Sequence, residues 1–129
     1  ALEYAPVALV SAKEGVGVLE VLEVARDLYR QASTRVTTGQ LNRVVEEAMQ
    51  VRGPHRRGRR PPKVLYATQV SVRPPTVVLF VNDPDIFDAA FTRFLANRLR
   101  ERLPFSEVPI RLLYRRRRRS ERETAVEPR

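Results

Sequence analysis

At 129 residues with a net charge of +9, the chain is long enough for one ordinary domain, or for a small domain and part of another. One histidine and no cysteine exclude a disulfide framework and a Cys/His zinc site, so no metal site is expected. No apolar run reaches the roughly 20 residues that cross a bilayer, and a secretory signal is absent, so we expect a cytoplasmic protein without membrane contact.

The N-terminal segment predicts a strand, a loop and a helix. Tyr4–Val10 is a short apolar run, and Ser11-Ala12-Lys13 follows it. Apolar side chains then recur at spacings of three and four, as on one face of a helix that ends near residues 32–33: Val18, Leu22, Ala25 and Tyr29. The chain begins in strand-like sequence without methionine, so we expect a piece of a longer protein, although a processed mature chain would begin in the same way.

A second helix and a basic loop are predicted next. Thr37 and Gln40 have the spacing of a capping box at the start of the helix, and its apolar face is formed by Leu41, Val44, Val45 and Ala48. The helix should end before Gly53-Pro54. Residues 53–62 contain three prolines, two glycines and four arginines, so they are predicted to form a loop.

Two strands, a long helix and a last strand complete the predicted elements. The strands cover residues 63–72 and 76–81, with a turn forced by Arg73-Pro74-Pro75 between them. The helix is predicted from about Pro84 to Arg102, with Asp83 as its cap. The last strand is predicted over Val108–Tyr114, and a solvated tail should follow Arg115.

The predicted fold class is α+β. The order helix, strand, strand, helix, strand over residues 35–115 places both helices on one face of a three-stranded sheet. Residues 1–34 are predicted to be separate from this unit, and residues 116–129 to form a basic tail without fixed structure.

Positive charge is confined to two segments. Residues 52–63 and 111–122 carry +6 each, which leaves −3 on the remaining residues. This distribution predicts contact with the phosphate groups of a polyanion, although a solvated loop and tail stay an alternative. The predicted phosphate-binding residues are Arg56, Arg57, Arg59, Arg60, Arg73, Arg115, Arg116, Arg117, Arg118 and Arg119.

Short motifs bear on nucleotide binding. Ser11-Ala12-Lys13 after an apolar strand has the pattern with which P-loop GTPases close on guanine, where the backbone N–H of Ala12 would reach the base oxygen. Asn82-Asp83-Pro84-Asp85 lacks the lysine of the guanine motif Asn-Lys-x-Asp, so we interpret it as a helix cap. No G-x-x-x-x-G-K-S/T sequence occurs, so these residues alone are predicted to have no catalytic residues and no GTPase activity.

Two features bear on RNA binding. A typical KH domain clamps the nucleic-acid backbone with a G-x-x-G loop, which this sequence lacks. Tyr66 and Tyr114 could stack on bases if they faced out from the sheet, but we expect both in the core.

Five stretches, in one order, resemble the C-terminal region of the Der (EngA) family, bacterial GTPases in which two tandem G domains precede a KH-like domain. They are LNRVVEEA (41–48), YATQV (66–70), RPPT (73–76), FVNDP (80–84) and NRLR (97–100). The resemblance covers about residues 4–115. It implies that residues 1–34 are the last strand, guanine-binding loop and last helix of the second G domain, with Ser11, Ala12 and Lys13 at the guanine, and that residues 35–115 are a KH-like domain.

The resemblance also implies cofactors and partners. The parent protein would bind GTP or GDP with Mg²⁺, whereas this part alone would bind neither. Its role would be in maturation of the large ribosomal subunit, with rRNA and the preceding G domains as partners. Two alternatives stay open: a stand-alone RNA-binding module, and a regulatory domain that docks only on protein.

Overall fold

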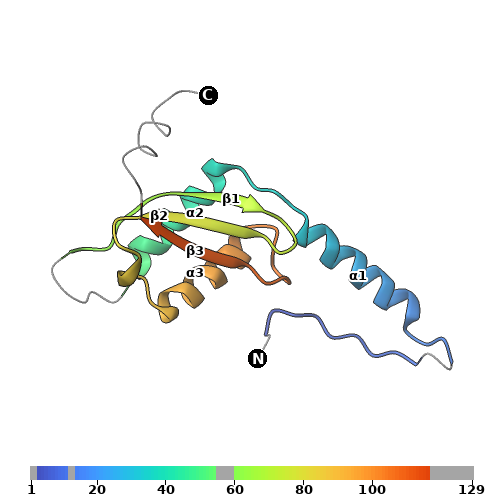
Figure 1. The fold of residues 1–129 in the computed structure, drawn as a ribbon. Helices are drawn as coiled ribbons and strands as arrows, with labels where there is room; N and C mark the ends of the chain where they lie inside the picture. The colour runs from blue at the N-terminus through green and yellow to red at the C-terminus, as the bar shows by residue number, and fades with distance from the viewer. Residues whose placement is uncertain (1–2, 12–13, 55–59, 117–129) are drawn as a thin grey trace.

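The computed structural model describes residues 3–11, 14–54 and 60–116 (Figure 1). Its elements are, in order, α1 (Val18–Ala32), α2 (Thr38–Val51), β1 (Val64–Ser71), β2 (Thr76–Val81), a 3-10 turn η1 (Pro84–Ile86), α3 (Ala89–Arg102) and β3 (Arg111–Arg116). From α2 onward this is the predicted α+β order of helix, strand, strand, helix, strand, which is therefore confirmed.

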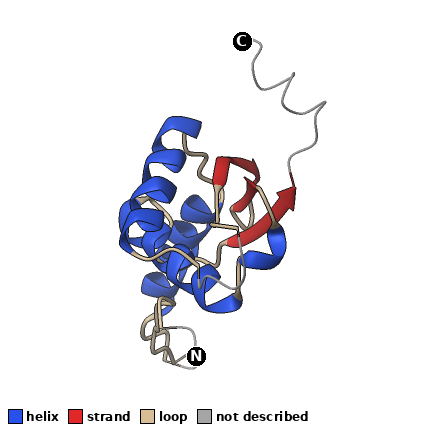
Figure 2. Ribbon diagram, turned by 90° about the vertical axis from the view of Figure 1, so that its left-hand side faces the viewer, coloured by secondary structure: helices blue, strands red, loops and turns tan. Residues whose placement is uncertain are grey.

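The sheet has the strand order β1-β2-β3, with β2 in the middle. β1 and β2 form the predicted antiparallel hairpin, whereas β3 runs parallel to β2. A parallel pair needs a long connection between its strands, and α3 lies in that connection. The helices α2 and α3 lie on one side of the sheet, and no helix of the described residues covers its other side (Figure 2).

The hydrophobic core lies between the sheet and these two helices. Side chains that are at most 3% exposed come from all three layers, and they include Leu41, Val45 and Ala48 of α2, Leu79 and Val81 of β2, and Phe91, Leu95 and Leu99 of α3. Full burial of one large apolar side chain stabilises a fold by about 1.5–3 kcal/mol. The unit that begins at α2 therefore has a core of its own.

The predicted capping box of α2 is confirmed. The Thr37 hydroxyl accepts a hydrogen bond from the Gln40 N–H at 3.1 Å, and the Gln40 side chain accepts one from the Thr37 N–H at 3.1 Å. One turn later, Asn42 accepts from the Ala67 N–H at 2.8 Å and donates to the Ala67 carbonyl at 2.9 Å. Asn42 therefore pairs with backbone groups on the free edge of β1, which would otherwise be open to another strand.

The predicted helix from Pro84 to Arg102 was wrong at its N-terminal end. Asp83 accepts from the Asp85 N–H at 3.1 Å and caps only the short turn η1. The backbone is then extended at Phe87, and Asp88 accepts from the Phe91 N–H at 2.8 Å to cap α3. Because Asp88 offers a second cap, the chain turns there and places the Phe87 ring against Tyr114 in the core, with ring centroids 5.0 Å apart.

The strand predicted at Tyr4–Val10 was also wrong, since the described residues before α1 contain only an isolated bridge between Ser11 and Val16. A strand needs a neighbour that pairs with its backbone, and the sheet of this chain lies beyond α1 (Figure 1). The segment is exposed instead, with Val7 and Leu9 both 89% accessible.

The last strand is shifted toward the C-terminus relative to the predicted Val108–Tyr114. Val108 is buried in the core but lies in the loop before β3, and pairing begins where the Arg111 N–H donates to the Pro75 carbonyl at 2.9 Å. All six residues of β2 then have a partner in β3, so the strand continues to Arg116. Residues 115–119 are five consecutive arginines, and the first two of them therefore belong to the sheet.

Candidate functional site

The two basic segments meet at one end of the sheet. Val64, the first residue of β1, pairs with Val81 at the end of β2, and Val81 pairs with Arg116 at the end of β3. Residues 60–63, which precede β1, and residues 115–116, which end β3, therefore lie at the same end of the sheet, here called the basic end (Figure 1). This juxtaposition follows from the parallel pairing of β2 with β3.

A hollow of about 490 Å³ lies at this end of the sheet. Three cationic side chains line it, those of Arg60, Lys63 and Arg116, and no acidic side chain does. Its other lining residues are Pro61, Leu65, Val81 and Asn82. The hollow has the charge to receive an anionic group such as a phosphate.

Asn82 fixes the end of the basic loop against β2. Its side chain accepts from the Lys63 N–H at 3.0 Å and donates to the Pro61 carbonyl at 2.9 Å, while its own N–H donates to the Lys63 carbonyl at 3.1 Å. These bonds hold Lys63 at the end of β2. No local sequence signal indicates this role, because Asn82 lies 19 residues from Lys63 and its motif is typical of a helix cap.

One carboxylate reaches the basic end from outside the hollow. Asp83 forms an ion pair of 3.3 Å with Arg116, whose side chain is 60% exposed, so the pair contributes little to stability. Within the described part of the chain, Arg60, Lys63 and Arg115 form no ion pair. These three cations are therefore free to meet an external anion.

Arg73, also predicted to bind phosphate, lies at the other end of the sheet, in the turn between β1 and β2. Its backbone N–H donates to the Ala32 carbonyl at 2.9 Å, and its guanidinium donates to the Ser33 hydroxyl at 3.1 Å. The guanidinium carbon also lies 5.6 Å from the ring centroid of Tyr29. Arg73 thus holds the C-terminal end of α1 and is apart from the basic end.

The remaining predicted site residues are only partly described. Ser11 closes the turn before α1, since its N–H donates to the Val16 carbonyl at 2.8 Å. The other predicted residues lie outside the described part of the chain: Ala12, Lys13, Arg56, Arg57, Arg59, Arg117, Arg118 and Arg119.

α1 is amphipathic, but none of its residues is buried. Leu22 and Tyr29 of the predicted apolar stripe are 59% and 63% exposed, and Leu19 beside them is 72% exposed. Val7 and Leu9 before the helix are each 89% exposed, so several large apolar side chains of this N-terminal part stay open to solvent.

The C-terminal end of α1 is fastened to the core unit. The Gln31 side chain donates to the Glu107 carboxylate and accepts from the Glu107 N–H, both at 2.9 Å. On the same side, the Arg100 guanidinium lies 3.8 Å from the ring centroid of Tyr4. An apolar hollow of about 680 Å³ remains between these parts.

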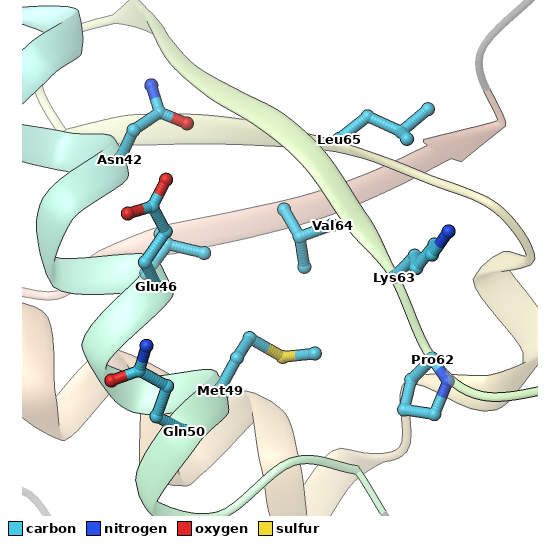
Figure 3. Close-up of a pocket in the computed structure, with 9 residues that line it drawn as sticks. Asn42, Glu46, Met49, Gln50, Pro62, Lys63, Val64 and Leu65 are labelled. Carbon is cyan, nitrogen blue, oxygen red and sulfur yellow. The ribbon is translucent and has the colours of Figure 1, made fainter.

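A third hollow, of about 280 Å³, lies between α2 and β1. Figure 3 shows Met49 of α2 extending toward β1, with Val64 and Leu65 on the strand and Lys63 just before it. Glu46 is the only carboxylate among its lining residues, so the hollow offers no pair of acids and no nucleophile with a base.

The two tyrosines considered for base stacking face opposite sides of the sheet. Tyr114 faces the core, where its hydroxyl lies 2.7 Å from that of Thr92, and burial raises its pKa above the ordinary 10.0. The core prediction is confirmed for Tyr114 and wrong for Tyr66. Ala67 and Leu79 are buried on the inner face, so Tyr66 and its partner Phe80 lie on the outer face, stacked at 4.6 Å.

Two features are absent from the described residues. No helix in residues 3–11, 14–54 and 60–116 has the length and apolar character that crossing a membrane requires. In the same ranges, no cluster of three or more histidine, cysteine or acidic side chains is arranged to hold a metal ion.

The comparisons with known proteins agree on one family. Residues 35–115 match the model of the KH-domain-like region at the C-terminus of EngA bacterial GTPase enzymes. The chain is 44% identical to GTPase Der of Rhodopirellula baltica over 120 residues, 93% of this chain. It is 43% identical to GTPase Der of Persephonella marina and 44% identical to that of Halothermothrix orenii, over 88% of this chain in each case. The chain spans about a quarter of the length of these relatives, 26% in all three.

Proposed function

The chain belongs to the KH-domain-like family from the C-terminus of EngA bacterial GTPases, and from this premise we propose that it is the C-terminal portion of a GTP-binding protein of ribosome biogenesis. In this proposal residues 35–115 bind ribosomal RNA on the large subunit. Residues 1–34 complete the preceding GTPase domain, and residues 116–129 extend the basic surface.

The single observation that supports RNA binding is the convergence of the two basic segments at one end of the sheet. Arg60, Lys63 and Arg116 line one hollow, and Arg115 precedes Arg116 on the same strand. Cations clustered in this way neutralise neighbouring phosphates and release counterions, which is the main source of affinity for a nucleic-acid backbone. Contacts of this kind fix position and carry no base information.

The open apolar surface of α1 supports the proposal for residues 1–34. The helix stripe needs a sheet to pack on, and Val7 and Leu9 belong to a segment that has strand-like sequence but no strand partner. The remainder of a GTPase domain would supply both. Ser11, Ala12 and Lys13 would then lie at the guanine base, and GTP or GDP with Mg²⁺ would bind mainly through residues of the parent protein that precede this chain.

The hydrogen bonds at residues 31–33 favour a second function, in which the KH-like domain acts on protein. Gln31 with Glu107, and Ala32 and Ser33 with Arg73, fix the direction of α1 relative to the sheet. A movement of the GTPase domain would therefore be passed directly to the KH-like domain and would change how its basic end is presented.

Sedimentation of the chain with purified ribosomal subunits tests the RNA-binding function. We expect the chain to sediment with the large subunit, and the variant with Arg60, Lys63, Arg115 and Arg116 all changed to Gln to stay in the supernatant. Equal sedimentation of this variant and the unchanged chain would refute the role of the basic end. Failure of the unchanged chain to sediment with the large subunit, or with its isolated rRNA, would favour the protein-docking function.

A further inference from the structure

The outer face of the sheet has a defined set of side chains. Val77, Leu79 and Val81 of β2 point into the core, so Val78 and Phe80 between them point outward. Leu112 and Tyr114 of β3 also pack against the core, so Leu113 and Arg115 point outward. Neither helix covers this face (Figure 2).

One row across this face combines two aromatic rings and a guanidinium. Tyr66 of β1 pairs with Phe80 of β2, and Phe80 pairs with Arg115 of β3. The two rings are stacked, with centroids 4.6 Å apart and planes at 20°. Both aromatic residues are half-buried, so each supports the other on the sheet while part of its ring stays accessible, and Arg115 beside them is exposed. The row thus places two aromatic rings beside a positive charge on the outer face of the sheet.

The charge of the sheet has a single sign. The three strands contain no aspartate and no glutamate, and β3 contributes Arg111, Arg115 and Arg116. Arg111 and Arg115 are both exposed on the outward face, at positions four residues apart on one strand. An anionic partner therefore meets no repulsion from the strands, whereas a basic protein surface would.

We propose that the row of Tyr66, Phe80 and Arg115 is a base-stacking subsite for single-stranded RNA. The subsite rests on the proposed RNA-binding function and extends it from the phosphates to the bases. Bases in an RNA duplex are inaccessible to a flat aromatic surface, whereas bases of a single strand stack on Tyr, Phe and Arg in sequence-tolerant fashion. The phosphate next to a stacked base then binds the cations of the basic end, and Arg111, four residues away from Arg115 on the same strand, offers a further positive charge along the path of the RNA.

The test compares two probes with the chain of residues 1–129: a single-stranded RNA of roughly ten nucleotides, and an abasic oligonucleotide of the same length. Tyr66→Leu and Phe80→Leu each remove one ring and no charge. We expect each to weaken RNA binding by about 5- to 100-fold, with an unchanged salt dependence and an unchanged affinity for the abasic probe.

Matched variants separate stacking from damage to the fold. Tyr66→Phe keeps the ring and should retain most of the affinity for RNA. Phe94→Leu removes a half-buried ring from α3, on the other side of the sheet, and should leave RNA binding unchanged. Circular dichroism checks that all variants fold alike.

The outcomes distinguish the subsite from the proposed function. If the unchanged chain binds the abasic probe as tightly as RNA, or if Tyr66→Leu and Phe80→Leu both bind RNA like the unchanged chain, the stacking subsite is refuted while phosphate binding stands. If the unchanged chain binds neither probe, both proposals fail.

Discussion

Replacing Arg60 and Arg115 together by Gln is the sharpest perturbation of the basic end. The two residues come from different segments, Arg60 from the loop before β1 and Arg115 from β3. Both are exposed, and neither forms an ion pair within the described part of the chain. Glutamine keeps much of the side-chain length and removes only the charge, so the fold should be retained.

The expected magnitude follows from the number of phosphates released. Each phosphate neutralised on single-stranded RNA contributes about −0.7 to the slope of log affinity against log salt, so loss of two contacts should flatten the slope by about 1.4. At about 0.1 M salt this corresponds to a loss of roughly 25-fold in affinity, or about 1.9 kcal/mol. Arg116→Gln should have a smaller effect, because Asp83 already neutralises part of that charge.

Fluorescence anisotropy with a labelled single-stranded RNA at several salt concentrations measures the slope. The matched control is Arg43→Gln with Arg93→Gln, which removes the same charge from exposed positions on α2 and α3. If this control flattens the slope as much as the change at Arg60 and Arg115, the affinity depends on net charge alone. The convergence of the two segments would then have no functional meaning.

Three further outcomes are expected. Calorimetric titration of residues 1–129 with GTP or GDP should detect no binding, since the sequence has no P-loop, and saturable micromolar binding would contradict this. Hydrogen exchange should be much faster for amides 19–26 of the exposed helix than for amides 77–81 of the buried strand, and equal protection would show that α1 belongs to the core unit. Burial raises the pKa of Tyr114, so the neutral form stabilises the fold up to about pH 10, and this contribution is lost as the pH rises through about 10 toward the raised pKa; denaturant unfolding should therefore show a steeper fall in stability above about pH 10 than in Tyr114→Phe, and equal slopes would refute the assignment.

Local sequence signals predicted the elements whose structure depends on residues close to one another in the chain. The capping box at Thr37 and Gln40 fixed the start of α2, and the run of apolar residues from Thr76 fixed β2 to its end residues. The same signals gave wrong predictions where the structure depends on contacts with residues that are distant in the chain. Tyr4–Val10 has strand-like composition but no adjacent strand, and the break at Asp88 depends on the packing of Phe87 against Tyr114.

The positive charge of the candidate site was predicted from the sequence, but the spatial arrangement of its residues was not. The two basic segments were visible as charge runs, whereas their meeting at one end of the sheet depends on the pairing of Val81 with both Val64 and Arg116. Arg73 belongs to neither charge run, and the turn places it at the other end of the sheet, against α1. The outward position of Tyr66 follows from the register with Phe80, which alternation in β1 alone did not reveal because of the irregularity between Val64 and Tyr66.

Mapping of amide chemical shifts during titration with single-stranded RNA tests the central claim most directly. If RNA binds where the two basic segments meet, the largest changes should fall on Arg60, Lys63, Asn82 and residues 115–116, with smaller changes on the outer face of the sheet. Changes confined to α1 and residues 105–109 would contradict the account, because they would place the ligand at the junction with the preceding domain.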